Sequence, residues 1–357
     1  MPTTDGSAPS STHSDTFARR VAVAVCIALG IGALAALLVE LSQVLLLIFG
    51  AVVVSTVLHA IGDPIARRTG IPRVWALPLS ALIVLGVVGG TLWFLGAQVA
   101  GQLAQAAQAA ESAIPKVGHA LGVPDLEAVI ASEFQRLAGG DMLGRVTSLG
   151  ATALGAATDL LIVLFGGVYI ALTPRLYRDG FVMLLPQAAR AKTSRAFDAA
   201  GRALKLWLLG QLFAMVITGV LTGLALWFIG VPAAAGLGLI AGVLEFIPLL
   251  GPFLGAAAGI LAAAGMGTSA LMWTIAAFLA IQQIESNVIQ PIVTRRSVEI
   301  PPALLLFAVI AFGAMLGVLG VILAVPLTVV LYVLVKALYV REVLDEPTSV
   351  PGEAKPG

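Results

Sequence analysis

Long runs of uncharged apolar residues constrain this chain more than any other feature of its sequence. Hydrophobic residues make up 59% of the 357 residues and charged residues only 11%, and the mean hydropathy is +1.02. Soluble domains carry about 25% charged residues, so this chain lacks the polar residues that a water-facing surface needs. It is therefore predicted to be an integral membrane protein whose main partner is the lipid bilayer.

The rarer residue types exclude several classes of function. The net charge of +1 offers no broad basic face for nucleic acid. The single cysteine, Cys26, excludes an intrachain disulfide, and the three histidines are scattered. The sequence has no HExxH, GxSxG or GxxxxGK[ST] motif. We therefore expect no enzyme, no catalytic residue, no bound metal and no cofactor.

Eight hydrophobic blocks are each long enough to cross a bilayer, which takes about 20 apolar residues. We predict an all-α polytopic protein in which about six blocks are full spans and two are broken or re-entrant. The blocks are 21–39, 41–62, 75–97, 151–173, 206–229, 233–264, 268–291 and 302–338. They form one membrane domain over 19–342, between tails at 1–18 and 343–357 that are predicted to be disordered.

Two of these blocks are too long for straight spans. Helices over 233–264 and 302–338 would measure about 48 and about 55 Å, against a hydrocarbon core of about 30 Å. Each could form a re-entrant hairpin, which we favour, or a single kinked span, which would give eight crossings. The two arrangements place Arg295 and Arg296 on opposite sides. The breaks are expected at Pro248, Gly251 and Pro252 in one block and at Gly313, Gly317 and Gly320 in the other.

The distribution of Lys and Arg predicts the orientation. The loops 63–74 and 174–205 are rich in basic residues and are expected in the cytoplasm, with both termini. The stretch 98–150 then lies outside, where acidic residues outnumber basic ones and glutamines recur near helical spacing. We expect short amphipathic helices there, favoured as a surface cap without a role in substrate binding.

Polar side chains interrupt the apolar sequence near two of the breaks. Glu245 either gates an ion or solute path or caps a helix near an interface, because a carboxylate at membrane depth is costly. Gln283, Asn287 and Gln290 share one helical face before Pro291, and Gln282 and Glu285 lie on a neighbouring strip. These amides either line a passage for a polar molecule, which we favour, or mark a helix end near the headgroups.

Small residues dominate the last block. Gly313 and Gly317 form a small-xxx-small pair, whose commoner role is close helix packing in lipid. Gly317, Gly320 and Pro326 are also candidate hinge or hairpin-tip positions. Broken helices are tolerated at membrane depth only where protein or a water-filled cavity satisfies their backbone, and paired breaks indicate a transport site.

Three segments in order resemble the autoinducer-2 exporter-like (AI-2E) family of bacterial membrane transporters: FIPLLGPFLG (246–255), IESNVIQPIV (284–293) and GAMLGVLGVILAVPLTVV (313–330). The likeness extends over roughly residues 20–340. Two departures are Arg295, where a glycine is usual, and Pro301 before Pro302. The family's elements fall on Ile247, Pro248, Gly251 and Pro252; on Glu285, Asn287 and Pro291; and on Gly313, Gly317, Gly320, Ala324 and Pro326.

This resemblance implies a secondary transporter of the bacterial inner membrane that forms a homo-oligomer. Members have been associated with release of autoinducer-2 and with sodium/proton exchange. We expect an exporter of a small polar solute that works by alternating access. A monovalent cation/proton antiporter using Glu245 and Glu285 is the alternative, and a membrane scaffold or an intramembrane enzyme carries lower weight.

Overall fold

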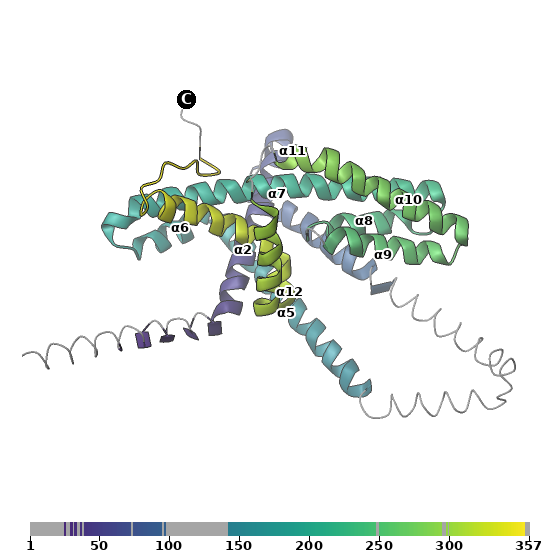
Figure 1. The fold of residues 1–357 in the computed structure, drawn as a ribbon, viewed down its shortest axis with the longest axis horizontal. Helices are drawn as coiled ribbons and strands as arrows, with labels where there is room; N and C mark the ends of the chain where they lie inside the picture. Colours follow the sequence, from purple (N-terminus) through teal and green to yellow (C-terminus); the bar gives the residue numbers. More distant parts are fainter. Residues whose placement is uncertain are drawn as a thin grey trace, which may run out of the picture. The chain divides into compact units, whose positions relative to one another are not determined.

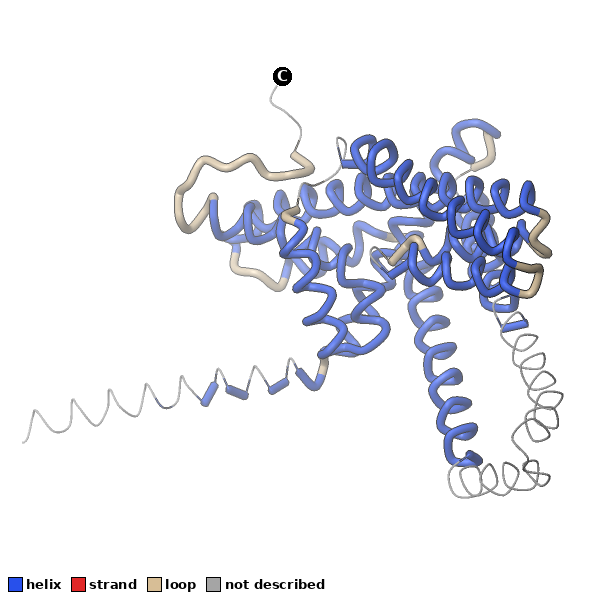
Figure 2. Tube along the Cα trace, turned by 45° about the vertical axis from the view of Figure 1, so that its right-hand side comes forward, coloured by secondary structure: helices blue, strands red, loops and turns tan. Residues whose placement is uncertain are grey.

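The computed structural model describes residues 25, 29–30, 32–33, 36–37, 39–72, 74–94, 96–97, 142–247, 250–294, 298 and 300–353. Helices are the only regular structure within these ranges (Figure 2), which confirms the predicted all-α class. The chain divides into two compact units, Met1–Leu46 and Leu47–Gly357. The predicted N-terminal tail, most of the 98–150 segment, Pro248, Arg295 and Arg296 lie outside the described residues.

The first helices follow the predicted blocks but extend past their ends. The described residues of block 21–39 are helical, and α2 then runs over Ser42–Thr69. Most of the predicted loop 63–74 is therefore the last turns of α2, which contains Pro64. A helix at Val74–Phe94 follows, and α5 (Met142–Leu172) begins before the predicted start at residue 151.

Most of the predicted basic loop 174–205 is helical. It contains α6 (Pro174–Met183) and the first half of α7 (Gln187–Ile229). Alanine, lysine and arginine, which are strong helix formers, dominate the start of α7. Ala196, Ala199, Ala200 and Ala203 recur at helical spacing and are buried, so this stretch has a packing face despite its charges. Its side of the membrane stays a prediction.

Block 233–264 forms two short helices, α8 (Ala234–Leu244) and α9 (Leu250–Ala264), that pack against each other and against α7 (Figure 1). Glycines permit the close approach to α7. A Cβ atom on Gly238 would lie 2.6 Å from the carbonyl oxygen of Gly219, and one on Gly242 would lie 2.7 Å from that of Met215. Close backbone contact of this kind is a main source of helix association in lipid.

Block 268–291 continues as one helical rod with a change of pitch. It comprises α10 (Thr268–Ile284), the π-helical turn η1 (Glu285–Ile289) and α11 (Gln290–Thr294). The N–H of Gln290 donates to the carbonyl of Glu285, five residues earlier. Such π turns occur frequently at functional sites.

Block 302–338 also folds back on itself. It comprises α12 (Pro302–Leu334) and the π-helical turn η2 (Val335–Val340), but Gly317 has φ 65° and ψ −148°, which no helix contains. A Cβ atom on Gly313 would lie 2.8 Å from Cγ2 of Val321, whereas residues eight apart in a straight helix are about 12 Å apart. Both long blocks are therefore helical hairpins rather than kinked rods. Their re-entry into a bilayer stays a prediction.

The chain after η2 packs on α7, although residues 343–357 were expected to form a disordered tail. Arg202 Nε donates to the carbonyl of Gly352 at 2.6 Å, and Val350 is buried. Arg341 Nη1 binds both carboxylate oxygens of Glu353, at 2.7 and 2.9 Å. Gly352 has φ 84°, and because it has no side chain, this segment lies directly on Ala199.

Ion pairs connect the basic half of α7 with its neighbours. Lys205 Nζ lies 3.3 Å from Oδ2 of Asp63 on α2. Lys192 Nζ lies 2.5 Å from Oε2 of Glu342, and this hydrogen bond lowers the pKa of Glu342 below its usual range. Both pairs are partly exposed, so each adds little to stability.

Four described helices are long and apolar enough to cross a bilayer, and a bent pair at Thr158–Leu172 and Pro174–Met183 would make a fifth. The four are Ser42–Thr69, Val74–Phe94, Gln187–Ile229 and Pro302–Val340. The last of these contains the fold-back at Gly317. The predicted total of eight hydrophobic blocks stays a prediction, because block 21–39 is described only in part.

We expect Gly317→Ala to destabilise the protein by about 1–3 kcal/mol, because its backbone lies in a region that only glycine occupies readily. No atom lies within 4 Å of where the new Cβ would sit, so crowding would not contribute. The check is thermal unfolding of the purified protein in detergent. Gly89→Ala is the matched control, since it too has open space but lies in a regular helix.

The sign of the effect separates the hairpin from a continuous helix. Alanine replacing glycine inside a regular helix stabilises by about 0.5–1 kcal/mol. A higher melting temperature for Gly317→Ala, like that expected for the control, would contradict the fold-back.

Candidate functional site

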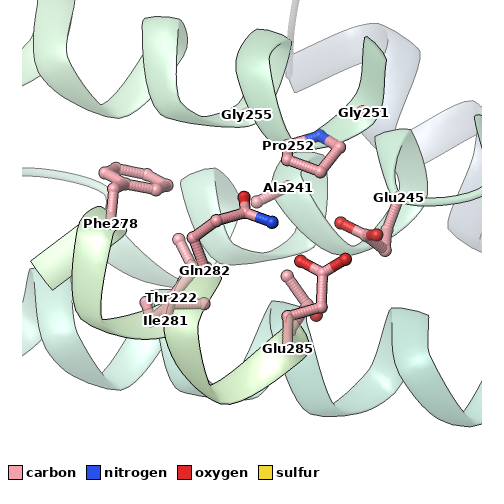
Figure 3. Close-up of a pocket in the computed structure, with 11 residues that line it drawn as sticks. Thr222, Ala241, Glu245, Gly251, Pro252, Gly255, Phe278, Ile281, Gln282 and Glu285 are labelled. Atoms are coloured by element: carbon pink, nitrogen blue, oxygen red, sulfur yellow. The ribbon is translucent and has the colours of Figure 1, made fainter. Parts of the chain in front are cut away.

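One small cavity lies where α7, the α8–α9 hairpin and the α10–η1 rod meet (Figure 3). Its volume is about 20 Å³, which is enough for a single water molecule. Eleven residues line it: Thr218, Thr222, Ala241, Glu245, Gly251, Pro252, Gly255, Phe278, Ile281, Gln282 and Glu285.

The break between α8 and α9 places Glu245 at this cavity. Glu245 ends α8, and its N–H donates to the carbonyl of Ala241 at 3.0 Å. The N–H groups of Phe246, Ile247 and Gly251 also find carbonyl partners within the turn, at 2.8–3.1 Å. The break therefore leaves few backbone groups without partners, which a helix interruption in lipid requires.

Gln211 of α7 satisfies one further group at the break. Its Nε2 donates to the carbonyl oxygen of Glu245 at 2.6 Å, and its side chain is buried. This bond ties the hairpin turn to α7. Gln211 therefore positions the Glu245 backbone, while the Glu245 side chain is left to face the cavity.

The α10–η1 rod contributes a strip of residues at helical spacing. Phe278, Ile281, Gln282 and Glu285 follow one another at i, i+3, i+4 and i+7 and all line the cavity. Glu285 is the first residue of the π turn. The close approach of α9 and α10 depends on glycine, because a Cβ atom on Gly259 of α9 would lie 2.5 Å from the Phe278 ring.

The two carboxyl groups are the central polar feature of the site. Glu245 is 4% exposed and Glu285 is 6% exposed, and their carboxyl groups point toward each other (Figure 3). Two ionised carboxylates only accept hydrogen bonds and repel each other in a buried site, so a proton on one of the two carboxyl groups would let it donate a hydrogen bond to the other.

Several oxygen atoms at the cavity lack partners. The hydroxyls of Thr218 and Thr222 and Oε2 of Glu245 are buried without a hydrogen bond. Buried polar atoms are normally satisfied by protein, water or an ion. The arrangement can therefore hold one water molecule or one small cation through oxygen atoms. Among the described residues, no group of three His, Cys, Asp or Glu side chains could hold a metal ion.

The structure brings together five of the predicted site residues and separates the others from them. Gln283, Asn287, Gln290 and Pro291 are exposed, and Asn287 Nδ2 donates to Oε1 of Gln283 at 3.0 Å. The glycines and Pro326 of the α12 hairpin do not line the cavity, and Pro248 lies outside the described residues. The five at the cavity are Glu245, Gly251, Pro252, Gln282 and Glu285.

Sequence reasoning missed the contribution of α7. Thr218 and Thr222 stand four residues apart in an apolar helix, so their spacing alone places them on one face. Threonine is ordinary in membrane helices, where its hydroxyl bonds to neighbours. The pair becomes notable only because neither hydroxyl has a partner. Gln211, which stands seven residues before Thr218 and so on the same face of α7, was also missed.

Curated bacterial proteins resemble parts of the chain. It is 34% identical to "Putative transport protein YrrI" of Bacillus subtilis over 42% of this chain and 43% of the relative. It is 26% identical to "Putative transport protein YueF" of the same organism over 59% of this chain and 58% of the relative. The match thus spans about half the length of these relatives.

A longer match joins the chain to "Putative transport protein MT0215" of Mycobacterium tuberculosis, with 28% identity over 72% of this chain and 73% of the relative. The family model described as AI-2E family transporter matches residues 20–340. That range includes every helix of the cavity and both hairpins. The chain therefore belongs to the AI-2E family of membrane transporters.

Proposed function

We propose that this protein exports a small polar solute by alternating access and that protonation of the Glu245–Glu285 pair drives the cycle. The observation that carries the proposal is the meeting of two buried carboxyl groups at the break of a helical hairpin. Broken helices whose turns face a cavity are the usual site of substrate and ion binding in secondary transporters.

The carboxyl pair provides two states that a proton can switch. With one shared proton the pair carries one negative charge, and with two it is neutral, so protons leave the pair in coupled steps. A protein can move between two conformations only when its ligand has different affinities for them. A pair buried in one conformation and open to water in the other would meet this requirement.

The small volume of the cavity is that expected for a closed conformation in the transport cycle. Its volume of about 20 Å³ excludes any organic solute, since drug-sized pockets measure about 300–1,000 Å³. In the proposed cycle the α8–α9 hairpin moves away from α10, which opens the cavity to one side of the membrane. Gln282 and the exposed amides Gln283 and Asn287 would then line the enlarged passage. The name of the family makes autoinducer-2 the first solute to test.

A second function, monovalent cation/proton antiport, is favoured by the oxygen atoms that lack partners. Thr218 Oγ1, Thr222 Oγ1 and Glu245 Oε2 are hard oxygen ligands of the kind that Na⁺ prefers, and the cavity has the volume for one small ion. In this version the cation and the proton compete for the same carboxyl pair.

The remaining features of the proposal concern the membrane. We propose that the protein lies in the bacterial inner membrane with both termini in the cytoplasm, because the basic half of α7 would then be inside. We also propose that it works as a homo-oligomer, as the family resemblance implies. Both hairpins would be re-entrant, with their tips inside the bilayer.

Glu245→Gln and Glu285→Gln should each reduce proton-driven solute movement to the level of protein-free liposomes. Glutamine keeps the size and much of the hydrogen bonding of glutamate but cannot release a proton. The measurement uses proteoliposomes loaded with autoinducer-2 or with a panel of small polar metabolites, and follows solute release after a pH gradient is imposed.

Glu346→Gln is the control, because Glu346 is an exposed carboxylate outside the cavity. It should behave like the unsubstituted protein. Wild-type rates in both cavity variants, with normal amounts of protein in the liposomes, would rule out proton coupling through the pair.

Thr222→Val tests the antiport version. Valine has the shape of threonine without the hydroxyl, so loss of one ligand should raise the half-saturating Na⁺ concentration roughly tenfold, or about 1.4 kcal/mol. Na⁺-dependent proton release is read from a pH-sensitive dye inside the vesicles. Thr222→Ser keeps the hydroxyl and should stay near wild type; equal curves for all three proteins would eliminate Thr222 as a ligand.

A further inference from the structure

A short helix at the end of α5 turns sharply away from it. The apolar segment Thr158–Leu172 of α5 and the helix α6 (Pro174–Met183) meet at 88°. With ten residues, α6 is about 15 Å long, so it is too short to cross a bilayer on its own. A helix at this angle to a membrane span runs along the membrane surface.

No residue of α6 is buried, although several are large and apolar. Leu176 and Met183 are each 68% exposed and Leu184, just after the helix, is 83% exposed. Leu176, Met183 and Leu184 stand at i, i+7 and i+8, so they form one continuous apolar face. No described residue covers this face.

The side of α6 that contacts the protein is a different one. Arg178 forms an ion pair with Asp198 of α7, and the rings of Phe181 and Phe197 meet edge to face at 5.3 Å. Phe181 is 52% exposed, less than Leu176, Met183 and Leu184. The contact with α7 therefore fixes the rotation of α6 and leaves its apolar face turned away from the protein.

Polar residues occupy the remaining side. Arg175 and Asp179, which stand at i and i+4, lie between the side of α6 that contacts α7 and its apolar face. Among the described residues, no ion pair is formed by Arg175. A helix with an apolar face, a polar strip that carries an arginine and a position along the surface has the properties of an interfacial membrane helix.

We propose that α6 is an in-plane membrane anchor, with Leu176, Met183 and Leu184 inserted at the boundary between headgroups and acyl chains. Arg175 then lies on the headgroup side, where its guanidinium can bind lipid phosphate. The partner is the lipid surface itself. This contact would hold the junction between α5 and α7 at a fixed depth while the α8–α9 hairpin moves.

Spin-label accessibility measures this depth directly. The single native cysteine is first replaced (Cys26→Ser), and spin labels are then attached at Leu176→Cys, Met183→Cys and Leu184→Cys. The protein is reconstituted in vesicles of phosphatidylethanolamine and phosphatidylglycerol. Oxygen collects in the acyl region and a water-soluble nickel chelate stays outside, so the ratio of their collision rates gives the depth of each label.

Labels at positions 176, 183 and 184 should collide with oxygen more often than with the nickel chelate. Arg175→Cys is the matched control on the polar strip of the same helix and should give the reverse ratio. Phe165→Cys on α5, where Phe165 is 61% exposed, reports a lipid-facing span. Gel filtration profiles like that of the unlabelled protein show that each variant is folded.

Two outcomes would overturn the proposal. If the three apolar positions collide mainly with the nickel chelate, as position 175 does, α6 lies in water. If they are protected from both reagents, another protein surface covers the apolar face, and the membrane is not the partner.

Discussion

The structure depends on how the backbone is satisfied where α8 stops. A helix that ends inside apolar surroundings leaves N–H and C=O groups that water cannot reach. Here the turn bonds of Phe246, Ile247 and Gly251 and the Gln211 bond to the Glu245 carbonyl provide partners. Because these bonds are made by the backbone and by Gln211, the Glu245 carboxyl group remains available to meet Glu285. The chemistry of the site thus follows from the way in which the break is stabilised.

Helix α7 connects the functional parts of the molecule. Its second half carries the threonines of the cavity and the glycines that admit the α8–α9 hairpin. Its first half binds α6, the segment after η2 and, through Lys205, the end of α2. Because α7 is a continuous helix of 43 residues, a displacement of one end also moves the other end. We therefore expect the α8–α9 hairpin to move relative to a unit that contains α6 and the C-terminal segment.

Much of this arrangement could be predicted from the sequence, and the rest could not for identifiable reasons. Blocks too long for a bilayer, together with proline and glycine near residues 250 and 317, indicated the hairpins. The strip with Gln282 and Glu285, rather than the amide face of Gln283 and Asn287, lines the cavity, because the rotation of α10 is set by its packing on α9 and α7. Charge density at 174–205 indicated a connection outside the bilayer and said nothing of its secondary structure, which is helical because of the alanine face of α7. Thr218 and Thr222 gave no signal, since only the structure shows that their hydroxyls lack partners.

The central claim is that Glu245 and Glu285 meet and share a proton. Infrared difference spectroscopy of the protein in lipid tests it directly, because a protonated carboxyl group has a C=O stretch distinct from that of a carboxylate and shifts in D₂O. We expect such a band in the unsubstituted protein and its shift or loss in Glu245→Gln and in Glu285→Gln, since each removes half of the pair. A band that persists unchanged in either variant, or that is missing from the unsubstituted protein, would contradict the account.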